Sequence, residues 1–460
     1  MARLILKTPL EASAEEVFAW HSRPGALQRL LPPWQDVRLE QSQGGLEVGA
    51  RRTLSVGMGP LRVPMRAVHT AYEPGRGFQD VLESGPFRTW KHHHRFYPRD
   101  ENGSVLEDEV EFSYHGGKLL ELLVNPFVIP QLHRMFTFRH RRTRQDLERH
   151  AGRATLRVGL TGSSGFLGSG LAAFLESGAH TVIRFQRQGP VGPGVVCWDP
   201  ATGECAGEDL EGLDAVVHLA GENIGGHRWN AAFKSKVRSS RVQATEALCR
   251  TLAALRRPPA CLLSASAIGY YGSSEAPATE QREAGQGFLA EVCQAWEQAT
   301  RPAEEAGIRV AHLRIGTVLG AQGGALARLL PVFRMGGGGA LGTGRQGFSW
   351  ISREDAIGAI HWLLYDQVSG PVNVVAPNPV SNEEFTRTLA RVLGRPALLR
   401  LDPWLLRLVV GEFADEALLS SQWVLPARLQ EQGFRFLYPD LEDALRAELG
   451  RFTLKPEGET

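Results

Sequence analysis

The sequence predicts an α/β fold: a doubly wound Rossmann-type parallel sheet, preceded by an α+β domain. Three observations lead to this prediction. A buried-strand pattern at residues 156–161 runs into a glycine-rich turn and then into a helical run. Further apolar strand patterns follow at βαβ spacing. The first 150 residues instead alternate as a series of antiparallel strands closed by a long helix.

The glycine-rich turn predicts a dinucleotide site. Gly162 allows a tight strand-to-helix turn, Gly165 lets backbone amides approach a pyrophosphate, and Gly168 lets the helix pack closely on the sheet. The positive end of the following helix favours the anion. The candidate cofactor-binding residues of this turn are Thr161, Gly162, Ser163, Ser164, Gly165, Phe166, Leu167 and Gly168.

The second strand of the unit, expected over 180–185, indicates which nicotinamide cofactor binds. An Asp or Glu at its end typically binds the free ribose hydroxyls of NAD, whereas a 2′-phosphate needs cationic donors. Here the strand ends in Arg184-Phe-Gln-Arg187, without an acid. We therefore expect NADP rather than NAD, with Arg187 as the first candidate and Arg184 as the second. The alternative is that both arginines are solvated surface residues.

Three further buried strands are expected over 214–221, 261–272 and 309–320, hydrophobic throughout because helices cover both faces of a parallel sheet. The first of them ends in small residues and would lie under the cofactor. The candidate cofactor-binding residues on these strands are Leu219, Ala220, Gly221 and Ser264.

The N-terminal part is expected as a domain of residues 1–152, followed by the nucleotide-binding domain over 153–460 with a small subdomain at about 380–450. Ser13-Ala-Glu-Glu16 is typical of a helix start, and 87–97 and 105–114 are the clearest strand patterns. A closing helix over 118–149 is expected to be interrupted at its two prolines, Pro126 and Pro130.

The triplet His92-His93-His94 raises the question of a metal site. Adjacent side chains of a strand point to opposite faces, so at most His92 and His94 could converge. No Cys or acid stands at a companion spacing nearby. We therefore interpret them as histidines on a half-exposed strand and predict no metal site.

Composition narrows the class of protein. Lys plus Arg number 51 and Asp plus Glu 50, so the chain has no large positive net charge that would attract nucleic acid or an anionic membrane. Five scattered cysteines lack metal-ligand spacing and indicate free thiols in a reducing compartment. No secretory segment or apolar run of about 18 residues is present. A soluble cytoplasmic protein with a small-molecule substrate is expected.

The order of elements in residues 1–150, together with the opening Pro9-Leu-Glu-Ala-Ser-Ala-Glu-Glu-Val-Phe18, resembles the START-like, or polyketide cyclase and dehydrase-like, helix-grip family. In that family a curved sheet wraps the last helix around an apolar cavity. The resemblance implies a domain that binds a hydrophobic or aromatic ligand.

Several motifs in residues 156–450 are specific to one group of proteins. They include Thr-Gly-Ser-Ser-Gly-Phe-Leu-Gly at 161–168, His-Leu-Ala-Gly-Glu-Asn-Ile at 218–224, Ser-Ala-Ile-Gly-Tyr-Tyr-Gly at 266–272 and Ser-Trp-Ile-Ser-Arg-Glu-Asp at 349–355. With these motifs, residues 156–450 resemble the extended short-chain dehydrogenase/reductase group, and within it an epimerase-like subfamily described as NAD-dependent epimerase/dehydratase. The resemblance implies an oxidoreductase or epimerase and a small C-terminal substrate domain after the doubly wound sheet, with a homodimer as a common arrangement.

One departure affects the chemistry. The wider group uses a Tyr and, four residues later, a Lys that lowers the pKa of the phenol. Aligning Glu297 with the family's downstream acid places Leu289 and Cys293 at those two positions. Two interpretations follow. In one, Tyr270 or Tyr271 replaces the missing acid/base beside the catalytic candidate Ser266. In the other, the protein is a non-catalytic NADP(H)-dependent sensor, a role made plausible by distant relatives associated with organelle and cell division.

Overall fold

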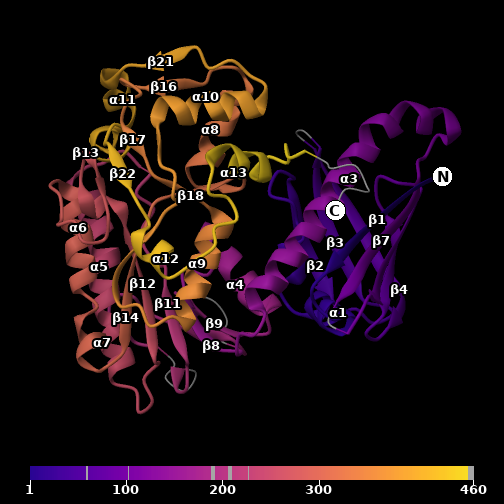
Figure 1. Cartoon of the computed structure of the whole chain (residues 1–460), viewed down its shortest axis with the longest axis horizontal. Helices are drawn as coiled ribbons and strands as arrows, with labels where there is room; N and C mark the ends of the chain where they lie inside the picture. The colour runs from indigo at the N-terminus through magenta and orange to yellow at the C-terminus, as the bar shows by residue number, and fades with distance from the viewer. Residues whose placement is uncertain (59–60, 102, 188–191, 206–209, 226, 454–460) are drawn as a thin grey trace. The chain divides into compact units, whose positions relative to one another are not determined.

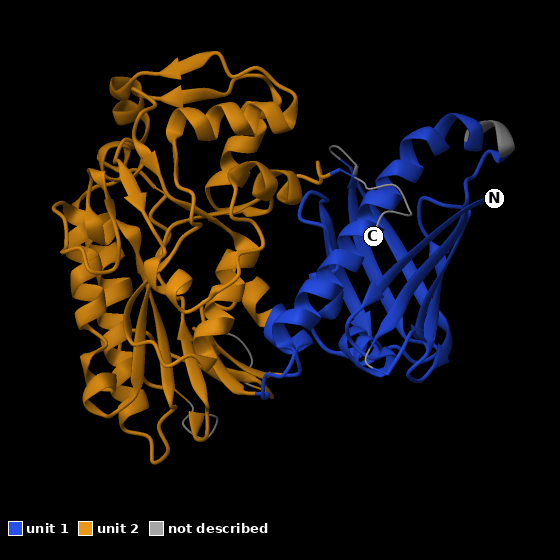
Figure 2. Cartoon of the chain, in the orientation of Figure 1, with its two compact units in different colours: residues 1–155, 173–179, 453–460 blue, residues 156–172, 180–452 orange. Residues whose placement is uncertain are grey.

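The structure is a computed structural model that describes residues 1–58, 61–101, 103–187, 192–205, 210–225 and 227–453. The chain forms two compact units (Figure 2). The first comprises mainly residues 1–155 with 173–179, and the second comprises residues 156–172 with 180–452. The division therefore falls within one helix, α4 (Phe166–Ser177).

The first unit is an antiparallel sheet of seven strands with one long helix, α3 (Gly117–His150), beside it (Figure 1). In space the strands follow the order β1-β7-β6-β5-β4-β3-β2. The strands are β1 (Ala2–Leu10), β2 (Val37–Gln43), β3 (Arg51–Met58), β4 (Leu61–Glu73), β5 (Gly77–Ser84), β6 (Thr89–Pro98) and β7 (Ser104–Ser113).

Two short helices, α1 (Ala14–Ser22) and α2 (Ala26–Arg29), follow β1. The predicted helix start is confirmed, because the side chain of Ser13 accepts a hydrogen bond from the backbone N–H of Glu16 at 3.2 Å. Apolar residues of α1, β6 and β7 pack into one core, which includes Trp20 and Phe96. A second core joins β6 and β7 to α3.

The predicted interruption of α3 is wrong. The helix runs unbroken from Gly117 to His150 with Pro126 and Pro130 inside it. The two prolines stand four residues apart, and four residues bring side chains to the same side of a helix. Both are exposed. The hydrogen bonds that each proline removes are therefore lost on the side where water can replace them.

The second unit is built on a parallel sheet of seven strands in the order β10-β9-β8-β11-β12-β14-β19. The chain moves outward from β8 through β9 to β10, returns to β11, and continues in the opposite direction. Its strands are β8 (Arg157–Thr161), β9 (Thr181–Gln186), β10 (Val195–Cys197), β11 (Ala215–His218), β12 (Cys261–Ala267), β14 (Arg309–Ile315) and β19 (Gly370–Val374).

Helices lie on both faces of this sheet (Figure 1), which confirms the predicted doubly wound class. The helices of this unit after α4 are α5 (Ala231–Ala253), η2 (Ile268–Tyr271), α6 (Phe288–Gln298), α7 (Arg301–Glu305), α8 (Gly324–Arg334), α9 (Arg353–Tyr365), α10 (Asn382–Leu393), α11 (Pro403–Val410), η3 (Ala414–Leu418), α12 (Ala427–Glu431) and α13 (Leu441–Glu448). Among the described residues, none of the helices combines the length and the apolar character that crossing a membrane requires.

Short two-stranded pairs complete the second unit, and one of them corrects a prediction. The stretch expected as one strand over 309–320 is two strands, because β14 ends at Ile315 and β15 joins a different sheet with β18. The short strands are β13 (Ser274–Ala278), β15 (Thr317–Gly320), β16 (Gly339–Leu341), β17 (Gly347–Phe348), β18 (Trp350–Ser352), β20 (Val380–Ser381), β21 (Leu399–Leu401) and β22 (Gln422–Val424).

Candidate functional site

The order of the large parallel sheet reverses between β8 and β11, and the glycine turn lies at the carboxyl end of β8. In open parallel sheets, this reversal point is where ligands bind. Gly162 has a φ of +70°, and a Cβ there would come within 2.9 Å of the backbone carbon of Leu219. A Cβ on Gly168 would come within 2.2 Å of the carbonyl oxygen of Gly162. Both positions therefore require glycine, as the sequence predicted for the turn and for the helix packing.

A buried hydrogen-bond chain holds this turn against the end of β11. The Thr161 hydroxyl oxygen accepts hydrogen bonds from the backbone N–H groups of Leu219 and Ala220, at 3.1 and 3.2 Å. Its hydroxyl proton is therefore directed at Nδ1 of His218, 2.8 Å away. Nε2 of His218 lies 2.9 Å from the hydroxyl of Thr245 on α5. The predicted residues Thr161, Leu219 and Ala220 thus meet at one point.

The middle of the turn is open to solvent, as the approach of a phosphate group requires. The turn residues range from buried Thr161 and Gly168, through half-buried Gly162, Ser163, Phe166 and Leu167, to exposed Ser164 and Gly165. The backbone N–H of Gly165 donates to the carbonyl oxygen of Gly162 at 2.9 Å. The ring of Phe166 packs so closely on Gly320 and Gly323 that a Cβ at either glycine would overlap with it.

Arg187 directly follows β9, the strand beside β8, and its side chain is exposed. Arg184 lies within β9 and is half-buried. The end of β9 carries no carboxylate among the described residues up to 187. Of the two candidate arginines, Arg187 therefore has the greater freedom to reach a bound molecule.

Gly221 follows β11, and Ser264 lies in the middle of β12, level with the last residue of β11. Ser264 pairs in register with His218. Its hydroxyl is buried and has no hydrogen-bond partner among the residues that the structure describes. A Cβ on Gly221 would lie 3.4 Å from the guanidinium carbon of Arg241. Both residues therefore border the same edge of the sheet as the turn.

A second buried network begins at Ser266 on β12. The Ser266 hydroxyl donates to Oε1 of Glu297 on α6, at 2.7 Å. Arg314 of β14 donates to both carboxylate oxygens of Glu297, each at 2.8 Å. Arg314 also donates to the hydroxyl oxygen of Tyr271 at 2.9 Å, and that hydroxyl donates to Oδ1 of Asn373 at 2.7 Å. The network links five elements: β12, α6, β14, η2 and β19.

The two candidate tyrosines differ in their surroundings. Tyr271 is buried, and both functions of its hydroxyl, as donor and as acceptor, are used within the network. Burial raises the pKa of this phenol, while the nearby Arg314 opposes the change. Tyr270 is half-buried, and the guanidinium of Arg314 lies 3.4 Å from the centre of its ring. Tyr270 is therefore the better placed of the two to meet a substrate.

Leu289 and Cys293 pack on the backbone of η2. A Cβ on Gly269 would lie 3.2 Å from Cβ of Leu289 and 3.8 Å from Sγ of Cys293. Burial raises the pKa of the Cys293 thiol to about 12, so the side chain is neutral near pH 7. The two positions that carry Tyr and Lys in the wider dehydrogenase group form an uncharged wall here.

Sequence reasoning missed Arg314 and Asn373 as partners of the candidate tyrosines. A signal was present, because Arg314 interrupts a strand whose neighbours Leu313 and Ala311 are fully buried apolar residues. A charged residue in such a strand requires a buried partner. That partner is Glu297, which the sequence analysis used only to align the motif.

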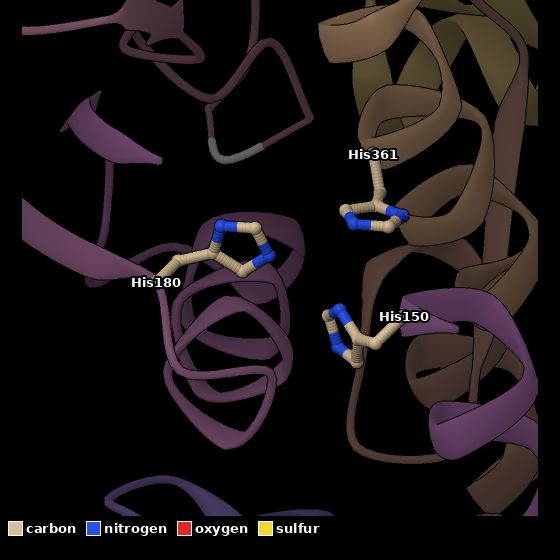
Figure 3. Close-up of side chains that lie close together, drawn as sticks. All are labelled: His150, His180 and His361. Atoms are coloured by element: carbon tan, nitrogen blue, oxygen red, sulfur yellow. The ribbon is translucent and has the colours of Figure 1, made fainter. Parts of the chain in front are cut away.

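A pair of histidines lies away from this edge, at the amino end of β9. The rings of His180 and His361 meet edge to face with their centroids 5.6 Å apart (Figure 3). Nδ1 of His180 accepts a hydrogen bond from the backbone N–H of Leu156 at 3.0 Å. This contact links the starts of β8 and β9.

Comparison with known proteins agrees with this architecture. The model of the NAD dependent epimerase/dehydratase family matches residues 158–376. The polyketide cyclase / dehydrase and lipid transport model matches residues 10–138, and a domain of unknown function, DUF1731, matches 403–448. An epimerase family protein of Mycobacterium bovis is 43% identical over 290 residues, which cover 63% of this chain and 96% of that protein.

Two solved structures are also similar. A nucleoside-diphosphate sugar epimerase from Corynebacterium glutamicum is 33% identical with a TM-score of 0.79, covering 97% of this chain and 90% of that one. The human epimerase family protein SDR39U1, solved with NADPH, is 34% identical with a TM-score of 0.60, covering 65% of this chain and all of that one.

The fold and the glycine turn define a Rossmann-type nucleotide-binding protein of the short-chain dehydrogenase/reductase type. Within that class, this chain belongs to the NAD dependent epimerase/dehydratase family. It also carries an N-terminal domain of the polyketide cyclase-like type.

Proposed function

We propose that this protein binds NADPH at the carboxyl edge of β8 and β11 and acts as an oxidoreductase or epimerase on a small molecule with a hydroxyl or carbonyl group. The main support is the buried Thr161–His218 contact, which holds the open glycine turn at the reversal point of the sheet. Backbone amides of the turn other than that of Gly165, which donates to Gly162, would hold the pyrophosphate, and the nicotinamide would supply the hydride chemistry.

The choice of NADPH over NADH depends on the end of β9. An exposed Arg187 and the lack of an acid at 184–187 suit a 2′-phosphate. The human epimerase family protein SDR39U1 was solved with NADPH, which supports the same choice. Charge-assisted hydrogen bonds from one arginine contribute about 1.5–3 kcal/mol, which corresponds to at least a tenfold change in affinity.

Calorimetric titration of the full chain with NADPH and NADH tests the choice of cofactor. Arg187→Ala should weaken NADPH binding at least tenfold and leave NADH binding nearly unchanged. Arg250→Ala is the matched control, because Arg250 is exposed on α5 and paired with Glu246. An equal loss for both cofactors would exclude Arg187 from the 2′-phosphate site.

In the proposed enzyme, Ser266 and Tyr270 contact the substrate oxygen. Ser266 would do so by exchanging its hydrogen bond to Glu297 for one to the substrate. Tyr270 stands over Arg314, whose positive charge would favour negative charge that develops on the phenol oxygen during proton transfer. Tyr271 is proposed as a positioning residue, since its hydroxyl already holds Arg314 and Asn373.

A second candidate function is a non-catalytic NADPH-dependent sensor. Its support is the uncharged wall of Leu289 and Cys293 at the positions of the usual Tyr and Lys. Absorbance of NADPH mixed with a panel of aldehydes, ketones and nucleotide sugars separates the two functions. Tight binding of NADPH without oxidation by any compound, together with no exchange of label in a sugar epimerisation assay, would favour the sensor.

We also propose that the N-terminal domain binds an apolar ligand, in agreement with the polyketide cyclase-like model that matches it. One unit would then capture a molecule that the other modifies or reports on. A homodimer remains a prediction, which light scattering of the purified chain can test.

A further inference from the structure

The face of the first unit's sheet that α3 covers carries a cluster of buried ionisable side chains. His92 and His94 of β6 lie on that face between Trp90 and Phe96 of the same strand. The two histidines are only 3% and 8% exposed. The ring of His92 lies edge-on to Phe136 of α3, with 5.0 Å between centroids. The half-exposed strand expected from the sequence is therefore buried on this side.

Sheet register brings two acids to these histidines. Antiparallel pairing places Asp80 of β5 opposite His92, and Asp108 of β7 opposite His94. Directly paired residues of neighbouring strands point to the same face and lie close together. The expectation that no acid accompanies the histidines is therefore wrong, because the acids come from the two adjacent strands.

The distances show which ring nitrogens each acid faces. Oδ2 of Asp80 lies 3.2 Å from Nδ1 of His92. Oδ1 of Asp108 lies 3.4 Å from Nε2 of His92 and 2.6 Å from Nδ1 of His94. The other oxygen of Asp108 lies 3.0 Å from Nε2 of His140 on α3. The carboxylate of Asp108 therefore contacts the imidazole rings of His92, His94 and His140.

The polar atoms of this cluster are close together but poorly paired. Nε2 of His92, Nδ1 of His94 and Oδ1 of Asp108 are buried and form no hydrogen bond of good geometry within the described residues. One ligand atom from each of Asp80, His92 and His94 lies within 4.8 Å of the others. Nε2 of His92 and Nδ1 of His94 face Asp108, whereas Nδ1 of His92 faces Asp80. A single ion between Asp80, His92 and His94 would therefore be within reach of all three side chains while Asp108 keeps its contacts to the rings.

We propose that Asp80, His92 and His94 bind a divalent transition-metal ion, with zinc as the ion best suited to them. Two imidazoles and one carboxylate are a common zinc ligand set, and three protein ligands leave a fourth position open. Asp108 would act as a positioning residue. Metal-bound histidines typically donate their second ring N–H to a carboxylate, which fixes the ring orientation.

The same strand offers a matched control for this site. His93 points to the opposite face of the sheet, where its Nδ1 lies 2.8 Å from Nη2 of Arg95. His93→Gln changes the same residue type, one position away, without touching the cluster. His94→Gln and Asp80→Asn remove one ligand each with little change of shape, and Asp80, at 16% exposure, is the milder site to alter.

The full chain, stripped with a chelator and dialysed against zinc sulfate and then against buffer, should retain about one zinc per chain by mass spectrometry. His93→Gln should retain the same amount. His94→Gln and Asp80→Asn should bind zinc at least about tenfold more weakly, since even residues behind a metal ligand typically contribute about 10- to 100-fold. Cobalt should give the visible bands of a tetrahedral ion in the wild-type chain and in His93→Gln only.

Two outcomes would overturn the proposal. One is a wild-type chain that holds no zinc after this treatment. The other is zinc binding by both His94→Gln and Asp80→Asn as tight as that of His93→Gln, which would assign the ion to other side chains. Circular dichroism verifies that each variant is folded, and the wild-type stoichiometry tests the site even if a variant fails to fold.

Discussion

The hydroxyl of Thr161 lies 2.8 Å from Nδ1 of His218, and both side chains are fully buried. Because Thr161 already accepts two backbone N–H groups, it donates its own proton to the imidazole. His218 is then neutral with its proton on Nε2, directed at Thr245. This contact joins the first strand of the nucleotide-binding unit to the strand on the other side of the reversal point.

Removal of the Thr161 hydroxyl should destabilise the second unit. Thr161→Val keeps the shape of the side chain but leaves two backbone N–H groups and one imidazole nitrogen without their partner. An unsatisfied buried group costs about 1–3 kcal/mol. Urea unfolding should therefore show a loss of at least this size, with weaker NADPH binding. Thr181→Val, at an exposed position of β9, is the control and should stay within about 0.5 kcal/mol of wild type.

The stability of the second unit should depend on pH through His218. Burial lowers its pKa to about 4 from an ordinary value of 6.5. Between these values the unfolded chain binds a proton that the folded chain excludes, so the free energy of unfolding falls as the pH drops from 6.5 to 4. The contribution is on the order of 3 kcal/mol. Urea unfolding across this range should show a flatter profile for His218→Gln, and an unchanged slope would contradict the assignment.

The two tyrosines should respond differently to loss of the hydroxyl. Tyr271→Phe removes the acceptor of Nη1 of Arg314 and the donor to Oδ1 of Asn373, two buried atoms, and should destabilise the chain by about 1–3 kcal/mol. Tyr270→Phe should be nearly neutral for stability but should slow any turnover about 10²- to 10⁴-fold at unchanged NADPH affinity. Unfolding curves and single-turnover NADPH oxidation measure the two effects. Equal stability losses would argue against separate roles.

Residues 1–152, expressed alone, should fold cooperatively. This segment contains the whole seven-stranded sheet and α3, and about 150 residues bury enough surface for independent stability. The fragment should also bind an apolar dye or a fatty acid. Aggregation would argue against a boundary at residue 152. A folded fragment without affinity for any apolar probe would instead indicate a cavity filled by its own side chains.

Much of the nucleotide-binding unit could be predicted from local sequence. Gly162 and Gly168 stand where the backbone leaves no room for a side chain, and this requirement is visible as a spacing of glycines between a strand and a helix. The buried strands around them are continuous apolar runs. Local patterns were sufficient because neighbouring residues create these constraints.

The side-chain networks were decided only by tertiary structure. Sequence alone placed Ser266 and Tyr271 near each other, but Glu297, Arg314 and Asn373 reach them from a helix and two other strands. Similarly, the alternation of β6 predicted that His92 and His94 share a face, yet it contained no information on what faces them.

The physical reason is sheet register. A one-residue slip of β5 or β7 would turn its acid to the opposite face, and the register that prevents it depends on the packing of whole strands. By itself, the sequence determined the class of fold, the glycine turn and the basic end of β9. The meeting of Asp80 with His92 and of Asp108 with His94 depended on the folded sheet, because pairs so distant in sequence become neighbours only when the strands align.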